Sequence, residues 1–165
     1  MAFRSICVTD TNFWIDLDTG GLIGPIFQLP FEWQVPDVIA EELKRPAGAE
    51  LVRRGLRVRE LDGGQVAEVV ALAAVYPHPS RSDLFALVLA RAQRALLLTG
   101  DRHLRQAAEQ EGVKVHGTLW LLDELVERSV ITPRDAADAL QLMREGHRRL
   151  PAEEVDRRLR RWRGP

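Results

Sequence analysis

Three aspartates in this sequence follow or begin predicted elements in a way that would bring their carboxylates together. Asp10 follows the β-branched run Ser5 to Thr9, and Asp101 follows the apolar run Ala95 to Thr99. Both runs are typical of strands, and sites in an open parallel sheet form at the carboxyl ends of its strands. Asp83 begins the helix that leads back into the second strand, so its first turn lies at the same edge. We therefore expect the three carboxylates to share one rim.

A glutamate from a fourth segment is expected to join them. Pro36 suits the first turn of a helix, and Val38 and Ile39 mark the apolar face of that helix. Glu42 lies four residues after Val38 and three after Ile39, so it borders the inward face. Glu41 falls on the polar side and is expected in solvent.

Four carboxylates in one crevice repel one another unless a cation or shifted pKa values compensate. Hard divalent ions such as Mg²⁺ take oxygen ligands of this kind, and they support hydrolysis of phosphodiesters. Each aspartate also has a purely structural interpretation, because aspartate caps helices in any protein. Asp83 even completes a capping-box pattern with Ser80. Convergence on one rim, together with the inward Glu42, favours a metal site.

Other constellations are missing. No glycine-rich nucleotide-binding motif, Walker-type motif or Gly-x-Ser-x-Gly elbow occurs. The scattered histidines, with a single cysteine, do not have the spacing of a zinc site, and we interpret them as surface or loop residues. The four tryptophans are expected to pack in the core rather than to stack on bases.

The composition predicts a soluble domain in a reducing cytoplasm. A length of 165 residues suits one domain. The longest apolar stretch, Leu84 to Ala90, is far shorter than the ~18 residues that suggest a membrane span, and the N-terminus does not resemble a signal peptide. The net charge of −1 does not favour nucleic acid, but the basic stretches Lys44 to Arg59 and Arg144 to Arg163 are either phosphate-binding surfaces or solvated helix faces.

Strands alternate with helices along the chain, which predicts an α/β sheet, mostly parallel, with helices on both faces. Pro46 is expected to end the helix that starts after Pro36. The last two helices are expected to form an appendage. The strands are predicted at Ser5 to Thr9, Gln34 to Val35, Leu56 to Leu61, Ala95 to Thr99 and Val113 to Val115; the helices at Phe13 to Leu17, Leu22 to Leu29, Asp37 to Lys44, Asp62 to Tyr76, Ser80 to Arg94, Arg102 to Glu111, Thr118 to Arg128, Thr132 to Arg144 and Pro151 to Arg163.

Several of these segments, taken in order, resemble the PIN-domain nucleases. The resemblance covers Ser5 to Arg128 strongly and the remaining tail weakly, and it rests more on the ordered set than on any single motif. Glu111 to Leu119 also looks like one branch of that family. The other segments are Val8 to Asn12, Val35 to Leu43, Asp83 to Ala90 and Leu98 to Asp101.

The resemblance implies a PIN-like three-layer α/β/α fold with a mostly parallel central sheet and extra C-terminal helices. The chain is then one nuclease domain over 1–165, with a core of about 5–128 and a helical extension of about 129–165. The activity implied is Mg²⁺- or Mn²⁺-dependent cleavage of single-stranded RNA. Many relatives are toxins of bacterial toxin–antitoxin pairs, so a small antitoxin protein and a homodimer are implied partners.

Carried over by position, the resemblance makes Asp10, Glu42, Asp83 and Asp101 the catalytic, metal-binding acids. Asn12 and Thr99 match polar residues that support the site. Many relatives carry a further acid where this chain has His103, which puts a fully occupied second metal site in doubt. Basic residues that could contact RNA phosphates are Arg81, Arg102, Arg157 and Arg158.

Two other functions compete with the nuclease. One is a non-catalytic PIN-like module that binds RNA or protein, which the complete acid set argues against. The other is a phosphoacceptor receiver domain, which also gathers acids at strand ends but needs a lysine at a late strand end. The only lysines are Lys44 and Lys114, and neither is suitably placed.

Overall fold

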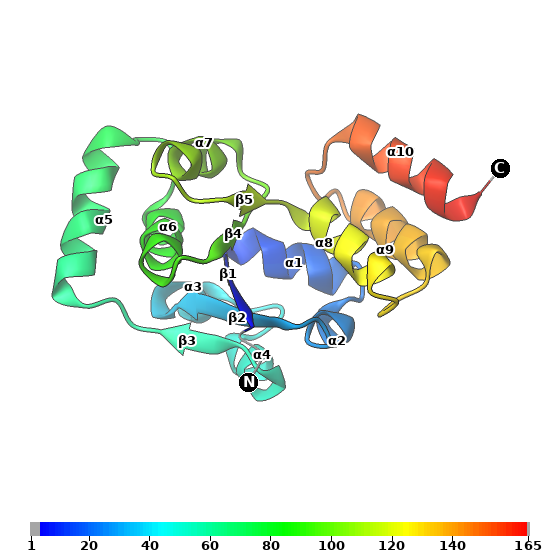
Figure 1. Cartoon of the computed structure of the whole chain (residues 1–165), viewed down its shortest axis with the longest axis horizontal. Helices are drawn as coiled ribbons and strands as arrows, with labels where there is room; N and C mark the ends of the chain where they lie inside the picture. The colour runs from blue at the N-terminus through cyan, green and yellow to red at the C-terminus, as the bar shows by residue number, and fades with distance from the viewer. Residues whose placement is uncertain (1–3, 165) are drawn as a thin grey trace.

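The central sheet of the protein has five strands, all parallel, in the order β3-β2-β1-β4-β5 (Figure 1). The structure is a computed structural model that describes residues 4–164. The central strand β1 (Ser5–Thr9) lies between β2 (Phe31–Pro36) and β4 (Leu96–Leu98), and β3 (Arg57–Arg59) and β5 (Val115–His116) form the edges. The expected parallel α/β sheet is confirmed.

The register of β1 and β4 decides where the site lies. Val8 pairs with Leu97 and Thr9 with Leu98, and the backbone N–H of Asp10 still donates to Leu98 at 3.3 Å. Asp10 and Thr99 therefore leave the sheet side by side, as the neighbouring carboxyl ends of parallel strands must.

Helices cover both faces of the sheet and produce the three-layer fold (Figure 1). Helix α6 packs against β1, β2 and β4, with α5 outside it, whereas α1 packs with α8 and α9. The helices are α1 (Thr11–Thr19), α2 (Ile23–Ile26), α3 (Asp37–Glu42), α4 (Gly48–Arg54), α5 (Gly63–Val75), α6 (Arg81–Gln93), α7 (Arg102–Gln110), α8 (Thr118–Glu127), α9 (Pro133–Glu145) and α10 (Ala152–Arg163).

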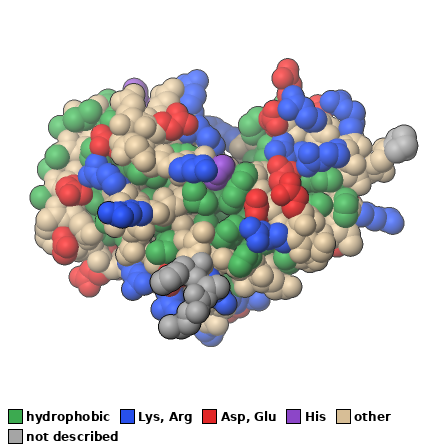
Figure 2. Space-filling model, in the orientation of Figure 1, with side chains coloured by type: hydrophobic (Ala, Val, Ile, Leu, Met, Phe, Trp, Pro, Cys, Tyr) green, Lys and Arg blue, Asp and Glu red, His purple; other side chains and the backbone are tan. Residues whose placement is uncertain are grey.

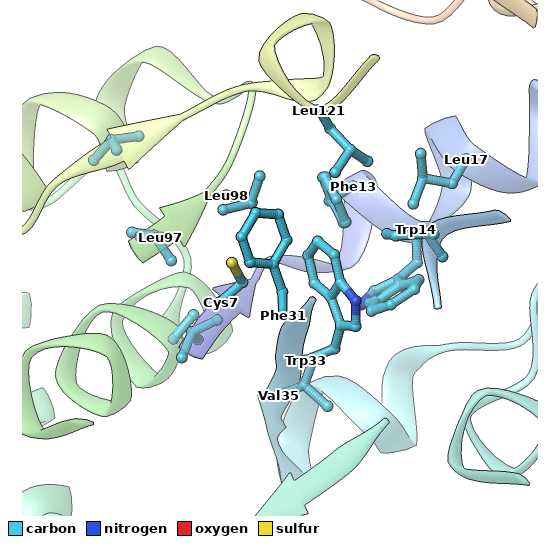
Figure 3. Packing of buried hydrophobic residues seen from close by; sticks show 14 of the residues in the cluster. Cys7, Phe13, Trp14, Leu17, Phe31, Trp33, Val35, Leu97, Leu98 and Leu121 are labelled. Carbon is cyan, nitrogen blue, oxygen red and sulfur yellow. The ribbon is translucent and has the colours of Figure 1, made fainter. Parts of the chain in front are cut away.

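The core between α1 and the sheet is aromatic (Figure 3). Phe13 stacks on Trp33 with ring centroids 5.8 Å apart, and Trp14 meets Trp33 edge-on at 6.0 Å. Phe13 and Trp14 are the third and fourth residues of α1 and are both buried. Their burial decides which face of that helix lies against the sheet. Asp10, which immediately precedes α1, is thereby held at the sheet edge.

The structure adds one helix to the predicted elements and moves the bounds of two strands. The helix that starts after Pro36 ends before Pro46, but the sequence pattern does not predict the further helix α4. The chain turns and begins this helix at Gly48, where a Cβ would lie 2.5 Å from the carbonyl oxygen of Ala40. Strand β2 begins at Phe31 rather than Gln34 because Phe31 and Trp33 belong to the core. Strand β5 covers Val115–His116 rather than Val113–Val115.

The C-terminal extension folds back onto the domain. Helix α9 packs against α1 and α8, and α10 packs on α9, with Val155, Leu159 and Trp162 buried. Arg158 ties α10 to α8 through two bonds to Asp123, of 3.0 and 2.7 Å. Among residues 4–164 no helix has the length and apolar character needed to cross a membrane.

Candidate active site

Asp10 is the most deeply buried of the four predicted acids, with 1 % of its surface exposed. It caps α1: its Oδ1 accepts the backbone N–H of Phe13 at 2.9 Å. Its Oδ2 accepts the hydroxyl proton of Thr99, which comes from the end of the neighbouring strand. Both carboxylate oxygens are therefore fixed in direction by the protein itself.

Asp101 lies beside Asp10 through the same threonine. The backbone N–H of Asp101 donates to Thr99 Oγ1 at 3.0 Å. Asp101 Oδ1 caps α7 by accepting from the N–H of Leu104 at 2.8 Å, and the carboxylate is exposed. Within the described residues its Oδ2 has no hydrogen-bond donor, so that oxygen can serve as a ligand.

Asp83 enters the rim from the first turn of α6. It forms the predicted capping box with Ser80: its Oδ2 accepts the Ser80 N–H at 3.0 Å, and its own N–H donates to Ser80 Oγ at 3.1 Å. The helix runs back across the sheet toward β4, which places its first turn at the carboxyl edge. The capping and site interpretations thus hold for the same residue.

Glu42, the last residue of α3, is linked to the neighbours of two of the aspartates. One carboxylate oxygen accepts from Thr11 Oγ1 at 2.8 Å, and the other accepts from the hydroxyl of Ser82. Thr11 follows Asp10 and Ser82 precedes Asp83, so Glu42 faces the rim. Glu41 is exposed and makes no side-chain hydrogen bond within residues 4–164.

The pKa values show that these carboxylates act on one another. Burial raises the pKa of Asp10 to about 7; the hydrogen bonds from Thr99 and Phe13 lower it, and the charges of Asp83 and Asp16 raise it. The pKa of Asp83 is also raised, first by burial and then by the charges of Asp101 and Glu42. Neighbouring negative charges therefore add to burial in destabilising the ionised forms of Asp10 and Asp83.

The donor set fits a hard divalent cation. All four side chains offer carboxylate oxygen, the ligand that Mg²⁺ and Mn²⁺ prefer. A cation would offset the repulsion that adds to burial in raising the pKa of Asp10 and of Asp83. Among residues 4–164, no three histidine, cysteine or acidic side chains lie close enough together to hold a metal ion in their present positions. The acids surround a shared rim rather than one point.

Sequence reasoning missed a fifth carboxylate, Asp16, next to the site. Asp16 is 6 % exposed; it accepts from Arg148 Nε at 2.6 Å and from Thr118 Oγ1 at 2.9 Å. Burial raises its pKa. Its position three residues after Phe13, on the apolar face of α1, was the available signal, because a buried carboxylate needs a partner. Its partner Arg148 lies 132 residues away and also donates to Asn12 at 3.3 Å.

Only one of the four predicted phosphate-binding arginines lies at a cavity near the acids. A cavity of about 530 Å³ opens beside Asp101 and is lined in part by Arg102 and Arg148. Arg81 is exposed at the start of α6. Arg157 pairs with Glu154 at 3.0 Å, and Arg158 pairs with Asp123 and Glu154.

Two of the four histidines, His103 and His116, are less peripheral than expected, whereas His78 and His147 are exposed and lie in loops. His116 lies in β5 and stacks on Trp120 with centroids 4.2 Å apart; burial lowers its pKa. His103, which stands where many relatives have an acid, stacks on His78 at 4.5 Å. The ring of His103 also lines the cavity beside Asp101.

Comparison with known proteins agrees with this architecture. One solved structure with a similar fold is that of a PilT N-terminus domain protein, SSO1118, from the hyperthermophilic archaeon Sulfolobus solfataricus P2. The TM-score is 0.50 at 15 % sequence identity, over 74 % of this chain and 94 % of that one. No curated protein matches the chain significantly. A family model described as a PIN domain matches residues 6–164, and the chain therefore belongs to the PIN-domain family.

Proposed function

We propose that this protein is a metal-dependent endoribonuclease that hydrolyses phosphodiester bonds of single-stranded RNA. PIN domains are generally nucleases, which is the coarse function that family membership supports. The observation that carries the finer proposal is the linkage of the acids: Thr99 bridges Asp10 and Asp101, and Glu42 is bound to the neighbours of Asp10 and Asp83.

In this proposal Asp10, Glu42, Asp83 and Asp101 hold Mg²⁺ or Mn²⁺. A bound divalent ion supplies an activated water and neutralises charge on the phosphate. Thr99 fixes the direction of Asp10, and the helix N–H groups at Phe13 and Leu104 orient one oxygen each of Asp10 and Asp101. These bonds hold the acids in place before substrate arrives, which lowers the reorganisation needed for catalysis.

Three substitutions test the proposal. Asp10→Asn, Asp83→Asn and Asp101→Asn should each abolish metal-dependent cleavage of single-stranded RNA while the protein stays folded. Asp135→Asn is the matched control, because Asp135 forms the same capping box in α9 without facing the rim. Cleavage at the wild-type rate by any of the three would remove that residue from the site. A cleavage rate that does not depend on Mg²⁺ or Mn²⁺ would indicate a contaminating nuclease and would favour a non-catalytic role for this protein.

We further propose that the protein is a cytoplasmic toxin, restrained by a small antitoxin and acting as a homodimer. Support comes from the family membership together with the exposed position of Asp101, which a partner could cover. The test is growth on induced expression in a bacterial host. Wild-type protein should arrest growth and Asp10→Asn should not, and co-expression of the neighbouring small reading frame should restore growth. Wild-type growth under induction would refute the toxin role.

A further inference from the structure

The cavity beside Asp101 has a basic wall that belongs to the C-terminal extension. The loop between α9 and α10 contributes His147, Arg148 and Arg149, and the first turn of α7 contributes Arg102 and His103. The acidic members are Asp101, at the rim, and the buried Asp16. In Figure 2, Lys and Arg side chains gather about the notch between the part of the molecule that carries α7 and the C-terminal helices.

Arg148 is held in this wall by a buried carboxylate. Its Nε donates to Asp16 Oδ1 at 2.6 Å and its Nη2 donates to Asn12 at 3.3 Å. A guanidinium carries five N–H donors, so most of the fork remains able to bind a further acceptor. The side chain of Arg148 is 23 % exposed, whereas the side chain of Asp16 is only 8 % exposed. The ion pair therefore orients Arg148 without consuming it.

The charges around the cavity favour an anion next to the acidic rim. Arg148 neutralises Asp16, which leaves Arg102 and Arg149 against Asp101 alone. Arg149 is exposed and forms no ion pair within residues 4–164. Arginine forks match phosphate oxygens geometrically. An acidic rim and a basic cavity side by side suit a polyanion that has phosphates at regular spacing.

A second cavity is a poorer candidate for the same role. It measures about 580 Å³ and includes Arg91 and Lys114. It lies at Ser5 and Leu96, the amino ends of β1 and β4, whereas the acids lie at the carboxyl ends. Arg91 is moreover bound to Glu68 and Glu111, at 3.0 and 2.7 Å.

We propose that the cavity beside Asp101 binds the phosphate adjacent to the scissile phosphodiester of a single-stranded polynucleotide. Arg148 and Arg149 are the side chains that bind this phosphate. Asp16 is a positioning residue that fixes Arg148. The C-terminal extension is then part of the substrate site rather than an appendage. This inference rests on the proposed nuclease function for the identity of the substrate, but the binding it describes needs neither metal nor cleavage.

The test is binding of a fluorescein-labelled, 2′-O-methylated oligouridylate, which resists cleavage, measured by anisotropy in chelator over a salt series. Arg149→Gln should weaken binding roughly tenfold and lower the slope of log affinity against log salt by about 0.7. Arg134→Gln is the control; it removes the same charge at the far end of α9 and should leave affinity and slope unchanged. The double variant Asp16→Asn with Arg148→Gln should behave as Arg149→Gln, since it leaves no unpaired buried charge.

Wild-type affinity and slope in folded Arg149→Gln and in the double variant would overturn the subsite. Binding of inorganic phosphate to the same variants can be measured by calorimetry. If the variants lose phosphate binding but bind oligouridylate as wild type does, the proposal is also overturned, because the cavity would then serve a free phosphate. The cleavage assay separates this proposal from the nuclease function. If the nuclease function is right but the subsite is wrong, Asp10→Asn loses cleavage while Arg149→Gln binds oligouridylate as wild type does. If the nuclease function is wrong, neither the wild type nor any variant cleaves RNA, whatever the binding assay shows.

Discussion

The hydroxyl of Thr99 donates to Asp10 from the end of the adjacent strand, and the same oxygen accepts the N–H of Asp101. One side chain thus connects the two strand-end acids of the candidate site. Its bond to Asp10 lowers the pKa of a carboxylate that burial drives up to about 7. Thr99 is therefore placed to influence when Asp10 ionises.

Replacing Thr99 by valine should raise the pKa of Asp10 further. The substitution removes a hydrogen bond to the ionised carboxylate and leaves the burial in place, so the charged form loses a stabilising partner. The measurement is a carboxyl NMR titration of Asp10 in chelator. Thr99→Ser keeps the hydroxyl and should titrate close to wild type. A lower pKa in Thr99→Val would show that the bond does not support the ionised form.

The stability of the metal-free protein should fall as pH rises from about 4 to above 7. The pKa of Asp10 is about 7 in the folded chain and 3.8 as its reference value. A raised folded-state pKa means that the stability linked to this group is fully present below the reference value and lost as pH rises through the folded value. Three pKa units correspond to roughly 4 kcal/mol. Urea unfolding in chelator across this range should show the decline in wild type and a much flatter profile in Asp10→Asn. Parallel profiles would assign the pH dependence to other groups.

Individual capping and strand signals were readable from the sequence, whereas long-range pairings were not. The capping box of Ser80 and Asp83 is formed as the local pattern predicts, because it depends on two residues that are three apart. The ion pair of Asp16 and Arg148 depends on how the last two helices fold back, and no local pattern encodes that. Helix α4 was missed for a related reason: the close approach of Gly48 to Ala40 is a packing contact, not a propensity.

The mutual repulsion of the acids predicts a stabilising effect of metal. Mg²⁺ or Mn²⁺ should raise the melting temperature of wild type, since a ligand that binds only the folded state stabilises it. Asp83→Asn removes one of the repelling charges while the amide oxygen can still accept from Ser80, so it should stabilise the chelated protein by about 1 kcal/mol and reduce the metal-induced shift. Thermal melting with chelator and with millimolar metal measures both effects. A wild type that melts identically in both conditions, with a less stable Asp83→Asn, would make these acids ordinary helix caps.

The adjacent glutamates at the end of α3 offer a matched pair for cleavage. Both side chains are exposed, but only Glu42 is held at the rim, where it accepts from Thr11 and from Ser82. Glu42→Gln should lower the single-turnover cleavage rate by at least about tenfold, because it removes a charge that helps hold the cation. Glu41→Gln removes the same charge one residue away and should cleave as wild type. The opposite ranking would mean that Glu41, and not Glu42, faces the cation.

By sequence, the arginine-rich helix α10 is either a phosphate-binding surface or a solvated helix face, and its ion pairs lead to a specific prediction for Arg158. Its side chain is 15 % exposed and is bound to Asp123 of α8 and to Glu154. Arg158→Gln should therefore destabilise the protein by about 2 kcal/mol, the usual size for hydrogen bonds between charged groups, and should speed amide hydrogen exchange in α10.

Arg160→Gln is the control: Arg160 is exposed on the same helix and makes no ion pair within the described residues, so its loss should change stability by less than about 0.5 kcal/mol. Arg158→Gln should not alter the salt dependence of oligouridylate binding, because the charge of Arg158 is already matched by two carboxylates. A reduced salt slope in Arg158→Gln, with α10 still protected from exchange, would instead show that this arginine leaves its partners to bind phosphate and would restore α10 as an RNA-binding surface.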